Sequence, residues 1–465
     1  MRRAARYRAV SLVLLIFGTA MSLSYAAESA QPGRKILALR EKALGLREAV
    51  EMALGHIDRT GPEIAEWKAK EEEGRLWPEL SLRGRQSFEN SSLVQSSGGT
   101  VLGTGGTIQR SAGEFTLSYN LLQFLESRPR IQEATAEKRA SAFRLRSEEA
   151  ATILRVSEIY LTFLSRQEAL EALDTLRREQ LRFLRQQEAR SRQQLISSIE
   201  LLRAEGDLIS LEREILSLRS ELATAELNLR RLTEFEPEQT MVVAFDPREL
   251  DLGFVQTGAL GGLLALAKEV NPQLQAAEAS AESARSGAEA TQSLLYPTLF
   301  ASVTSGFGRD KITGDTNLSS ADFRYGVFLT LNVPLFDWGV RQARVTQANL
   351  RAASRLRQAS RAAEEIKALI ESEYWSFLQQ GQSQELLERQ VRLANDELNQ
   401  TRIRVTAGVA SLGETLTALA KLVRLQKEFF ATKAEALTRG IRLALAVGRS
   451  PFTPSLPSPA PPVGP

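Results

Sequence analysis

The 465-residue sequence contains no cysteine and one histidine, His56. The lack of cysteine excludes disulfide bridges, thiolate chemistry and zinc sites that use cysteine ligands. A single histidine removes most histidine-based acid–base catalysis. Because no nucleophile, base and orienting group recur together elsewhere, we expect that the protein is not an enzyme and that it holds no cofactor or metal.

Acidic side chains are missing from the first 26 residues, where four arginines precede an apolar run and the small-x-small site Ser24-Tyr25-Ala26. This order predicts a secretory signal peptide over residues 1–26. An uncleaved anchor is the alternative, but the apolar run is shorter than the ~20 residues that a membrane-spanning helix needs. No cysteine follows the run, so we expect no lipid anchor. Cleavage takes Lys+Arg from 59 to 55 against 56 Asp+Glu, so the net charge changes from +3 to −1, and we expect no nucleic-acid partner.

Glycine and proline are absent from residues 130–188, and residues 340–405 contain only Gly381. Both stretches are rich in strong helix formers, and their apolar residues recur at spacings of three and four. We predict long helices over residues 128–190, 197–233, 338–405 and 411–447. A helix of ~60 residues is ~90 Å long, far beyond the size of an ordinary globular domain. Charged residues of both signs cover the rest of each helix surface, which indicates helices packed side by side with solvent-exposed faces.

Four short segments alternate apolar and polar residues, at about residues 78–88, 113–122, 297–307 and 323–333. They predict two long-looped hairpins, each with one apolar and one polar face. One interpretation is a pair of surface hairpins packed on the helices. Against it, the strand length matches the ~9–11 residues of a transmembrane strand with a lipid-facing side. Four strands cannot close a water-filled barrel, so such a barrel would be shared with copies of the chain.

An internal repeat divides the chain in two. The segment Leu117-Ser118-Tyr119-Asn120 aligns with Leu329-Thr330-Leu331-Asn332 at an offset of 212, and Ser197 and Glu200 align with Ser411 and Glu414 at an offset of 214. We predict repeats over residues 44–233 and 263–448, joined by a linker over 234–262 that lies around the middle of the helices. We expect residues 449–465 to form a proline-rich, disordered tail.

The second strand-to-helix junction, Val333-Pro334-Leu335-Phe336-Asp337-Trp338-Gly339, carries a family resemblance. It closely resembles the PLFD-x-G signature of TolC-like outer-membrane efflux proteins, with the signature positions at Pro334, Leu335, Phe336, Asp337 and Gly339. Further segments that resemble this family occur in the family's order at Asn271-Pro272, Tyr296-Pro297 and Arg404 to Leu416. The resemblance covers about Leu44 to Gly448.

The resemblance implies a homotrimer in which each chain gives four strands to one twelve-stranded barrel in outer-membrane lipid. The long antiparallel helices would form a periplasmic α-barrel. The function implied is a passive exit duct of a tripartite efflux system, with a periplasmic adaptor protein and an inner-membrane pump of RND or ABC type as partners. The outer membrane of a Gram-negative bacterium is the implied location. A duct for type I protein secretion, and a periplasmic coiled-coil scaffold without a pore, stay open as alternatives.

The resemblance also directs attention to the two helix tips. Glu414, with Glu200 as its repeat mate, would form a ring of carboxylates at the periplasmic entrance; the alternative is that each Glu interacts only with the dipole of its own helix. Arg402 and Arg404 would hold neighbouring tips together through ion pairs; the alternative is that both side chains are only solvated. The second tip has Gly408 and Ser411 where the first has Gln194 and Ser197. Because Gln194 is not glycine, we expect the first tip to turn differently from the second.

Overall fold

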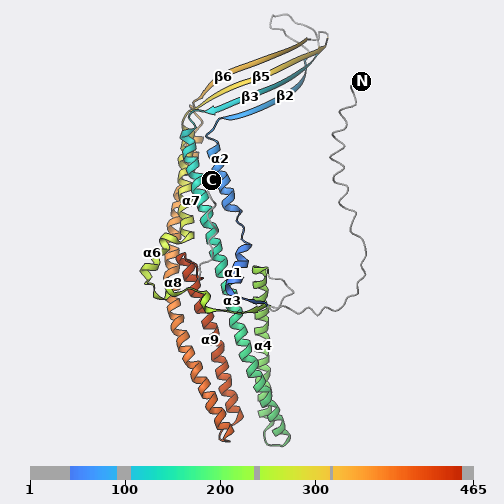
Figure 1. The fold of residues 1–465 in the computed structure, drawn as a ribbon, viewed down its shortest axis with the longest axis vertical. Coiled ribbons are helices and arrows are strands. Elements are labelled where there is room, and N and C mark those ends of the chain that lie inside the picture. The colour runs from blue at the N-terminus through green and yellow to red at the C-terminus, as the bar shows by residue number, and fades with distance from the viewer. Residues whose placement is uncertain (1–41, 92–105, 235–240, 315–317, 453–465) are drawn as a thin grey trace, which may run out of the picture.

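The computed structural model describes residues 42–91, 106–234, 241–314 and 318–452. The predicted signal peptide and nearly all of the proline-rich tail lie outside these residues. Long helices run along the length of the molecule, and a four-stranded sheet lies at one end of them (Figure 1). In the described part of the chain, no helix combines the length and the apolar character needed to cross a membrane.

The sheet consists of β2 (Glu79–Ser91), β3 (Gly106–Asn120), β5 (Thr298–Gly314) and β6 (Leu318–Asn332). The strand order is β2-β3-β5-β6, and every neighbouring pair is antiparallel. β2 and β6 are therefore the open edges, and they run in opposite directions. The strands extend beyond the predicted ranges, because cross-strand pairing continues through polar residues past the end of the apolar alternation.

Two helices span the length of the helical part: α3 (Phe124–Arg192) and α8 (Val340–Thr406). Toward the sheet they are accompanied by α2 (Thr60–Gly74) and α7 (Pro272–Gln292), and toward the far end by α4 (Ser198–Thr233) and α9 (Leu412–Val447). α3 packs against α2, α4, α7 and α9, whereas α8 packs against α7 and α9. The layer of helices therefore has α2 and α4 at one edge and α8 at the other.

Short elements gather at mid-length of the helices (Figure 1). They are α1 (Leu46–Gly55), α5 (Gly253–Thr257), α6 (Leu260–Val270), the 3₁₀ turn η1 (Pro247–Glu249), and the parallel strand pair β1 (Lys42–Leu44) and β4 (Met241–Val243). A second 3₁₀ turn, η2 (Ser293–Leu295), lies at the sheet end, just before β5. The described part of the linker thus lies at the middle of the helices. Buried side chains of α1, α3, α4 and α9, among them Val50, Tyr160, Leu229 and Ile441, pack there into one core.

The two halves of the chain have the same order of elements. In each, a helix leads into a hairpin, a long helix follows, and a return helix of 36 residues begins after a capping serine, Ser197 or Ser411. The helix that leads into the hairpin is shorter in the first half, with 15 residues in α2 against 21 in α7. The predicted fold, mainly helical with four strands and two internal repeats, is confirmed.

Candidate functional site

The strand register separates an apolar from a polar face of the sheet. Residues directly opposite one another share a face. One such row crosses all four strands as Leu80, Leu117, Val303 and Val327. A row three positions farther along, on the other face, holds Arg83, Glu114, Gly306 and Arg324. The apolar rows also include strongly exposed side chains of both edge strands: Leu82, Phe323, Tyr325, Leu329 and Leu331.

Both faces of the sheet carry a cavity. One of about 710 Å³ is lined mainly by residues of the apolar face, such as Gly84, Phe307 and Phe323, and a larger one lies on the polar face. The larger cavity, of about 1000 Å³, is lined mainly by side chains of the polar face, among them Arg85, Arg110, Arg324, Glu114 and Asp322. Glycines on the same face, such as Gly306 and Gly308, leave this space free of side chains. The arrangement pairs an exposed apolar face with a charged face, as a wall between lipid and water requires.

The signature residues build the junction between β6 and α8. The Asp337 carboxylate accepts hydrogen bonds from the backbone N–H of Gly339 (3.1 Å) and of Arg341 (3.0 Å). It thereby satisfies N–H groups of the first turn of α8, which have no partner within the helix. Gly339 has φ +82°, a left-handed conformation that glycine adopts without strain.

The apolar signature residues of this junction are exposed in the single chain. Leu335 is 91% exposed and Trp338 is 89% exposed, while Phe336 meets Trp338 edge to face with ring centroids 4.8 Å apart. Pro334 lies in the extended segment before them. A cluster of exposed apolar side chains of this size marks a surface that meets lipid or another chain.

The two helix tips turn in the same way, so the prediction of different turns is wrong. Gln194 has φ +56° and Gly408 has φ +73°, both left-handed. The hydrogen bonds correspond as well: Leu195 N–H donates to Arg190 O and Val409 N–H donates to Arg404 O, each at 2.9 Å. Glutamine in this conformation costs roughly 1 kcal/mol relative to glycine. The helix-closing hydrogen bonds and the packing of α3 on α4 outweigh that cost.

The caps of the two return helices differ. Ser411 and Glu414 form a capping box, in which Glu414 N–H donates to Ser411 Oγ (3.2 Å) and Ser411 N–H donates to Glu414 Oε1 (3.1 Å). At the first tip, Glu200 N–H donates to Ser197 Oγ (3.3 Å), but the Glu200 carboxylate does not complete the box. Both carboxylates are exposed at the far end of the helices.

Arg402 and Arg404 are also exposed near the second tip. Neither guanidinium has an ion-pair partner within the described part of the chain. Their positive charges are therefore free to meet another molecule.

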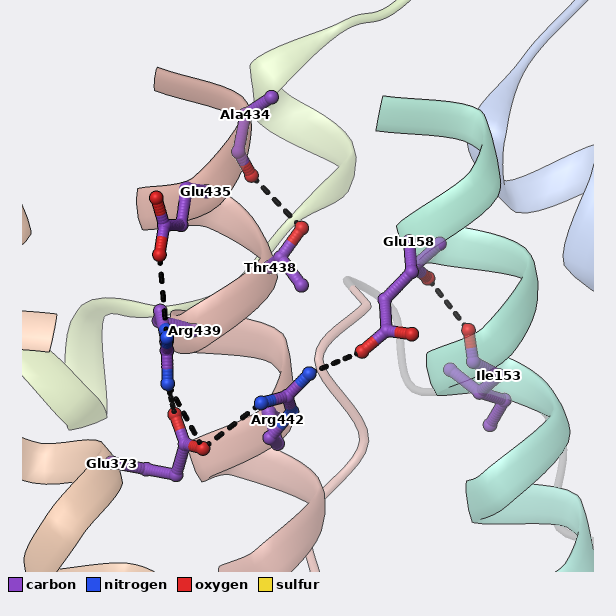
Figure 2. Close-up of polar contacts among 9 residues, drawn as sticks. Ile153, Glu158, Glu373, Ala434, Glu435, Thr438, Arg439 and Arg442 are labelled. Atoms are coloured by element: carbon purple, nitrogen blue, oxygen red, sulfur yellow. Dashed lines mark hydrogen bonds and ion pairs between the residues drawn. The ribbon is translucent and has the colours of Figure 1, made fainter. Parts of the chain in front are cut away.

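An ion-pair network at mid-length was missed by the sequence analysis (Figure 2). The Glu373 side chain of α8, 5% exposed, accepts hydrogen bonds from Arg439 (3.1 Å) and Arg442 (3.0 Å) of α9. Arg442 also pairs with Glu158 of α3, and Arg439 with Glu435. The signal was present, because Glu373 continues the apolar stripe of Ile366 and Ile370.

These contacts raise the pKa of both arginines. The hydrogen bond to Glu373 is the main cause at Arg439. At Arg442, burial lowers the pKa, but the hydrogen bonds to Glu158 and Glu373 outweigh it. The network therefore stays charged and joins three long helices. No group of three or more His, Asp or Glu side chains that could hold a metal ion occurs in the described ranges.

Comparisons with known proteins agree with this architecture. The model of the outer membrane efflux protein family matches residues 63–233 and 263–449. A membrane protein from Pseudomonas aeruginosa has the same fold, with 17% identity, a TM-score of 0.73, and coverage of 92% of this chain and 97% of that chain. The outer membrane channel CmeC of Campylobacter jejuni is similar, with 13% identity, a TM-score of 0.71, and coverage of 87% and 85%. The open state of the outer membrane channel MtrE of Neisseria gonorrhoeae has 18% identity, a TM-score of 0.66, and coverage of 92% and 96%.

No curated protein matches the sequence. The family match nevertheless covers both repeats and most of the chain. The predicted family is confirmed, and with it the location in the outer membrane of a Gram-negative bacterium, with the helices in the periplasm. The chain belongs to the outer membrane efflux protein family.

Proposed function

We propose that three copies of this chain form one exit duct, a twelve-stranded barrel in the outer membrane continued by a periplasmic tunnel of helices. The observation that carries the proposal is the pair of open edges of the sheet. Each strand of the sheet runs opposite to its neighbour, so β6 of one copy can pair with β2 of the next and keep the antiparallel pattern. Long unpaired edges are otherwise prone to aggregation, and closure removes them.

The edges of the helical layer support the same assembly. α4 exposes Leu202, Ile209 and Leu216 at intervals of seven residues, and α8 exposes Leu386 and Leu393 at the same interval. A seven-residue repeat of apolar side chains is typical of a helix that packs against a parallel or antiparallel partner helix. α4 of one copy and α8 of the next would cover these side chains.

The duct is passive in this proposal. A periplasmic adaptor and an inner-membrane pump of RND or ABC type would supply substrate at the helix tips, and small molecules are the proposed substrates. Residues 44–233 and 263–448 would be its two repeats, with 234–262 as the segment around its middle. A duct for secreted proteins differs from this proposal in the pump that co-purifies with the protein.

Cysteine labelling tests the barrel, since the chain has no cysteine of its own. Thr330 lies on the polar face and the adjacent Leu329 on the apolar face of β6. In proteoliposomes we expect Thr330→Cys to react at least tenfold faster than Leu329→Cys with a membrane-impermeant maleimide, because lipid covers the apolar face. Light scattering of the purified protein should give the mass of three chains. Equal labelling rates together with a monomeric mass would instead indicate a scaffold without a pore.

Glu414 is proposed to contribute to cation selectivity at the periplasmic entrance, with Glu200 near it. Three copies would bring their carboxylates together at a narrow mouth, where a ring of negative charge favours cations. We expect Glu414→Gln to lower the cation-to-anion permeability ratio in single-channel recordings several-fold. Glutamine can still accept the Ser411 hydrogen bond, so the variant removes the charge and keeps the cap. Glu200→Gln is the matched variant at the first tip. Unchanged reversal potentials in both variants would contradict the proposed ring of carboxylates.

Arg402 and Arg404 are proposed to hold neighbouring tips together through ion pairs with the next copy. Their replacement by glutamine would remove those pairs and keep the length of the side chains. We expect the double variant to show a higher resting conductance than the wild type in planar bilayers. Arg389→Gln on the same helix, whose Glu385 partner lies within the chain, is the control and should leave the conductance unchanged. A double variant that matches this control would mean that the tip arginines are only solvated.

A further inference from the structure

Two phenylalanines interrupt the polar face of the sheet. Phe300 on β5 lies opposite Thr330, and Phe328 on β6 lies opposite Ser302, so the two are diagonal neighbours on the same face as Arg83 and Glu114. They are the only large apolar side chains of that face among residues whose side chains the structure describes. Phe300 is 43% exposed and Phe328 is 55% exposed.

The Phe328 ring lies over Gly326 of the same strand. A Cβ atom added to Gly326 would be 2.8 Å from Cε2 and 2.9 Å from Cζ of Phe328, so the ring covers the backbone of this glycine. Phe328 also helps to line the larger cavity on this face. An aromatic ring over a strand glycine also stabilises a sheet. A purely structural role of Phe328 is therefore the alternative to ligand binding, and the experiment must distinguish the two.

The surroundings of the two rings carry a single kind of charge. The three rows that hold Phe300, Phe328 and Gly326 otherwise contain serine, threonine and asparagine, and their only ionisable side chain is Glu79 of β2. The arginines of the polar face begin one row farther from the helices, at Arg83 and Arg324. If β2 of one copy pairs with β6 of the next, Glu79 and Phe328 lie on the two strands that meet at the seam between copies.

We propose that Phe300, Phe328 and Glu79 form a band inside the barrel that binds organic cations with an aromatic or apolar body. The inference rests on the proposed trimeric duct. Each copy contributes two rings and one carboxylate at the end of the barrel nearest the helices. A cation over an aromatic face is attracted by the ring, and the carboxylate adds to this attraction in a confined space. The band would slow aromatic cations relative to other solutes of the same charge.

Block of the single-channel current by two matched cations tests the band. Benzyltriethylammonium and tetraethylammonium carry the same charge, and only the first has an aromatic ring. Added on the side of the extracellular loops, the aromatic cation should block the wild-type channel at a concentration at least fivefold lower. In Phe300→Ser/Phe328→Ser this ratio should fall toward one, and in Glu79→Gln both cations should block less.

The control is the double variant Phe300→Leu/Phe328→Leu, which keeps apolar side chains of similar size and should fold if the serine variant does not. It should lose at least half of the preference for the aromatic cation. An unchanged ratio in either double variant overturns the band and leaves Phe328 as a cover for Gly326. A wild-type protein that forms no channel overturns the duct itself, and the band with it.

Discussion

Replacing Glu373 with alanine is expected to lower the free energy of unfolding by about 3 kcal/mol. The carboxylate is 5% exposed and accepts hydrogen bonds from both Arg439 and Arg442. Its removal leaves two guanidinium groups without their shared partner, and breaking a buried pair on one side costs about 3–5 kcal/mol. We expect the lower end of that range because the arginine side chains are 29% and 31% exposed, so water reaches them.

The measurement is the loss of helical circular dichroism in guanidinium chloride, at one protein concentration, because the stability of an oligomer depends on concentration. Glu435→Ala is the matched control. Glu435 also pairs with Arg439, at 3.3 Å, but its side chain is 48% exposed. An exposed pair contributes about 0–1 kcal/mol, so this variant should unfold close to the wild type. Similar losses in both variants would contradict a special role for the buried carboxylate.

Replacing Tyr160 with phenylalanine is expected to lower the free energy of unfolding by about 1 kcal/mol. The Tyr160 side chain is fully buried, and its hydroxyl lies 2.8 Å from Leu44 O and 2.7 Å from Ala244 O. The single O–H hydrogen is shared between these carbonyls of β1 and of the residue after β4. Leu44 O also accepts the backbone N–H of Ala244, so the variant loses the net contribution of the hydroxyl hydrogen bond, about 1 kcal/mol, and leaves no fully buried carbonyl without a donor. Burial also raises the pKa of Tyr160, so the hydroxyl keeps its proton at neutral and moderately alkaline pH.

The same denaturant titration measures this variant. Tyr374→Phe is the control, because the Tyr374 hydroxyl has no hydrogen bond within the described ranges. We expect that variant to change the free energy of unfolding by less than about 0.5 kcal/mol. If Tyr160→Phe were equally neutral, the hydroxyl would not be what holds β1 and β4 against α3.

Much of the fold could be predicted because the relevant signals are local. Long stretches without glycine and proline gave helices that end within a few residues of the predicted positions. Ser411 followed by Glu414 is a capping box that can be recognised from the letters alone. The strands were predicted too short, because the alternation of apolar residues ends before the pairing does.

The candidate site was less accessible to prediction. The turn at Gln194 depends on the packing of α3 and α4, which overrides the preference of glutamine. The mid-length network joins residues that are 66 and 284 positions apart, Glu373 to Arg439 and Glu158 to Arg442. The apolar stripe of Ile366 and Ile370 indicates that the Glu373 side chain is buried, but no local pattern identifies the arginines that pair with it.

The amino-acid sequence by itself determined the helices, the strands with their two faces, the duplication and the family, since each depends on periodicity or on motifs within a few residues. Only the tertiary structure decided which charges are buried, how the first tip turns, and that Phe300, Phe328 and Glu79 share one end of the polar face. The physical reason is that strand register and helix packing bring distant residues together, and these depend on the whole chain rather than on any segment.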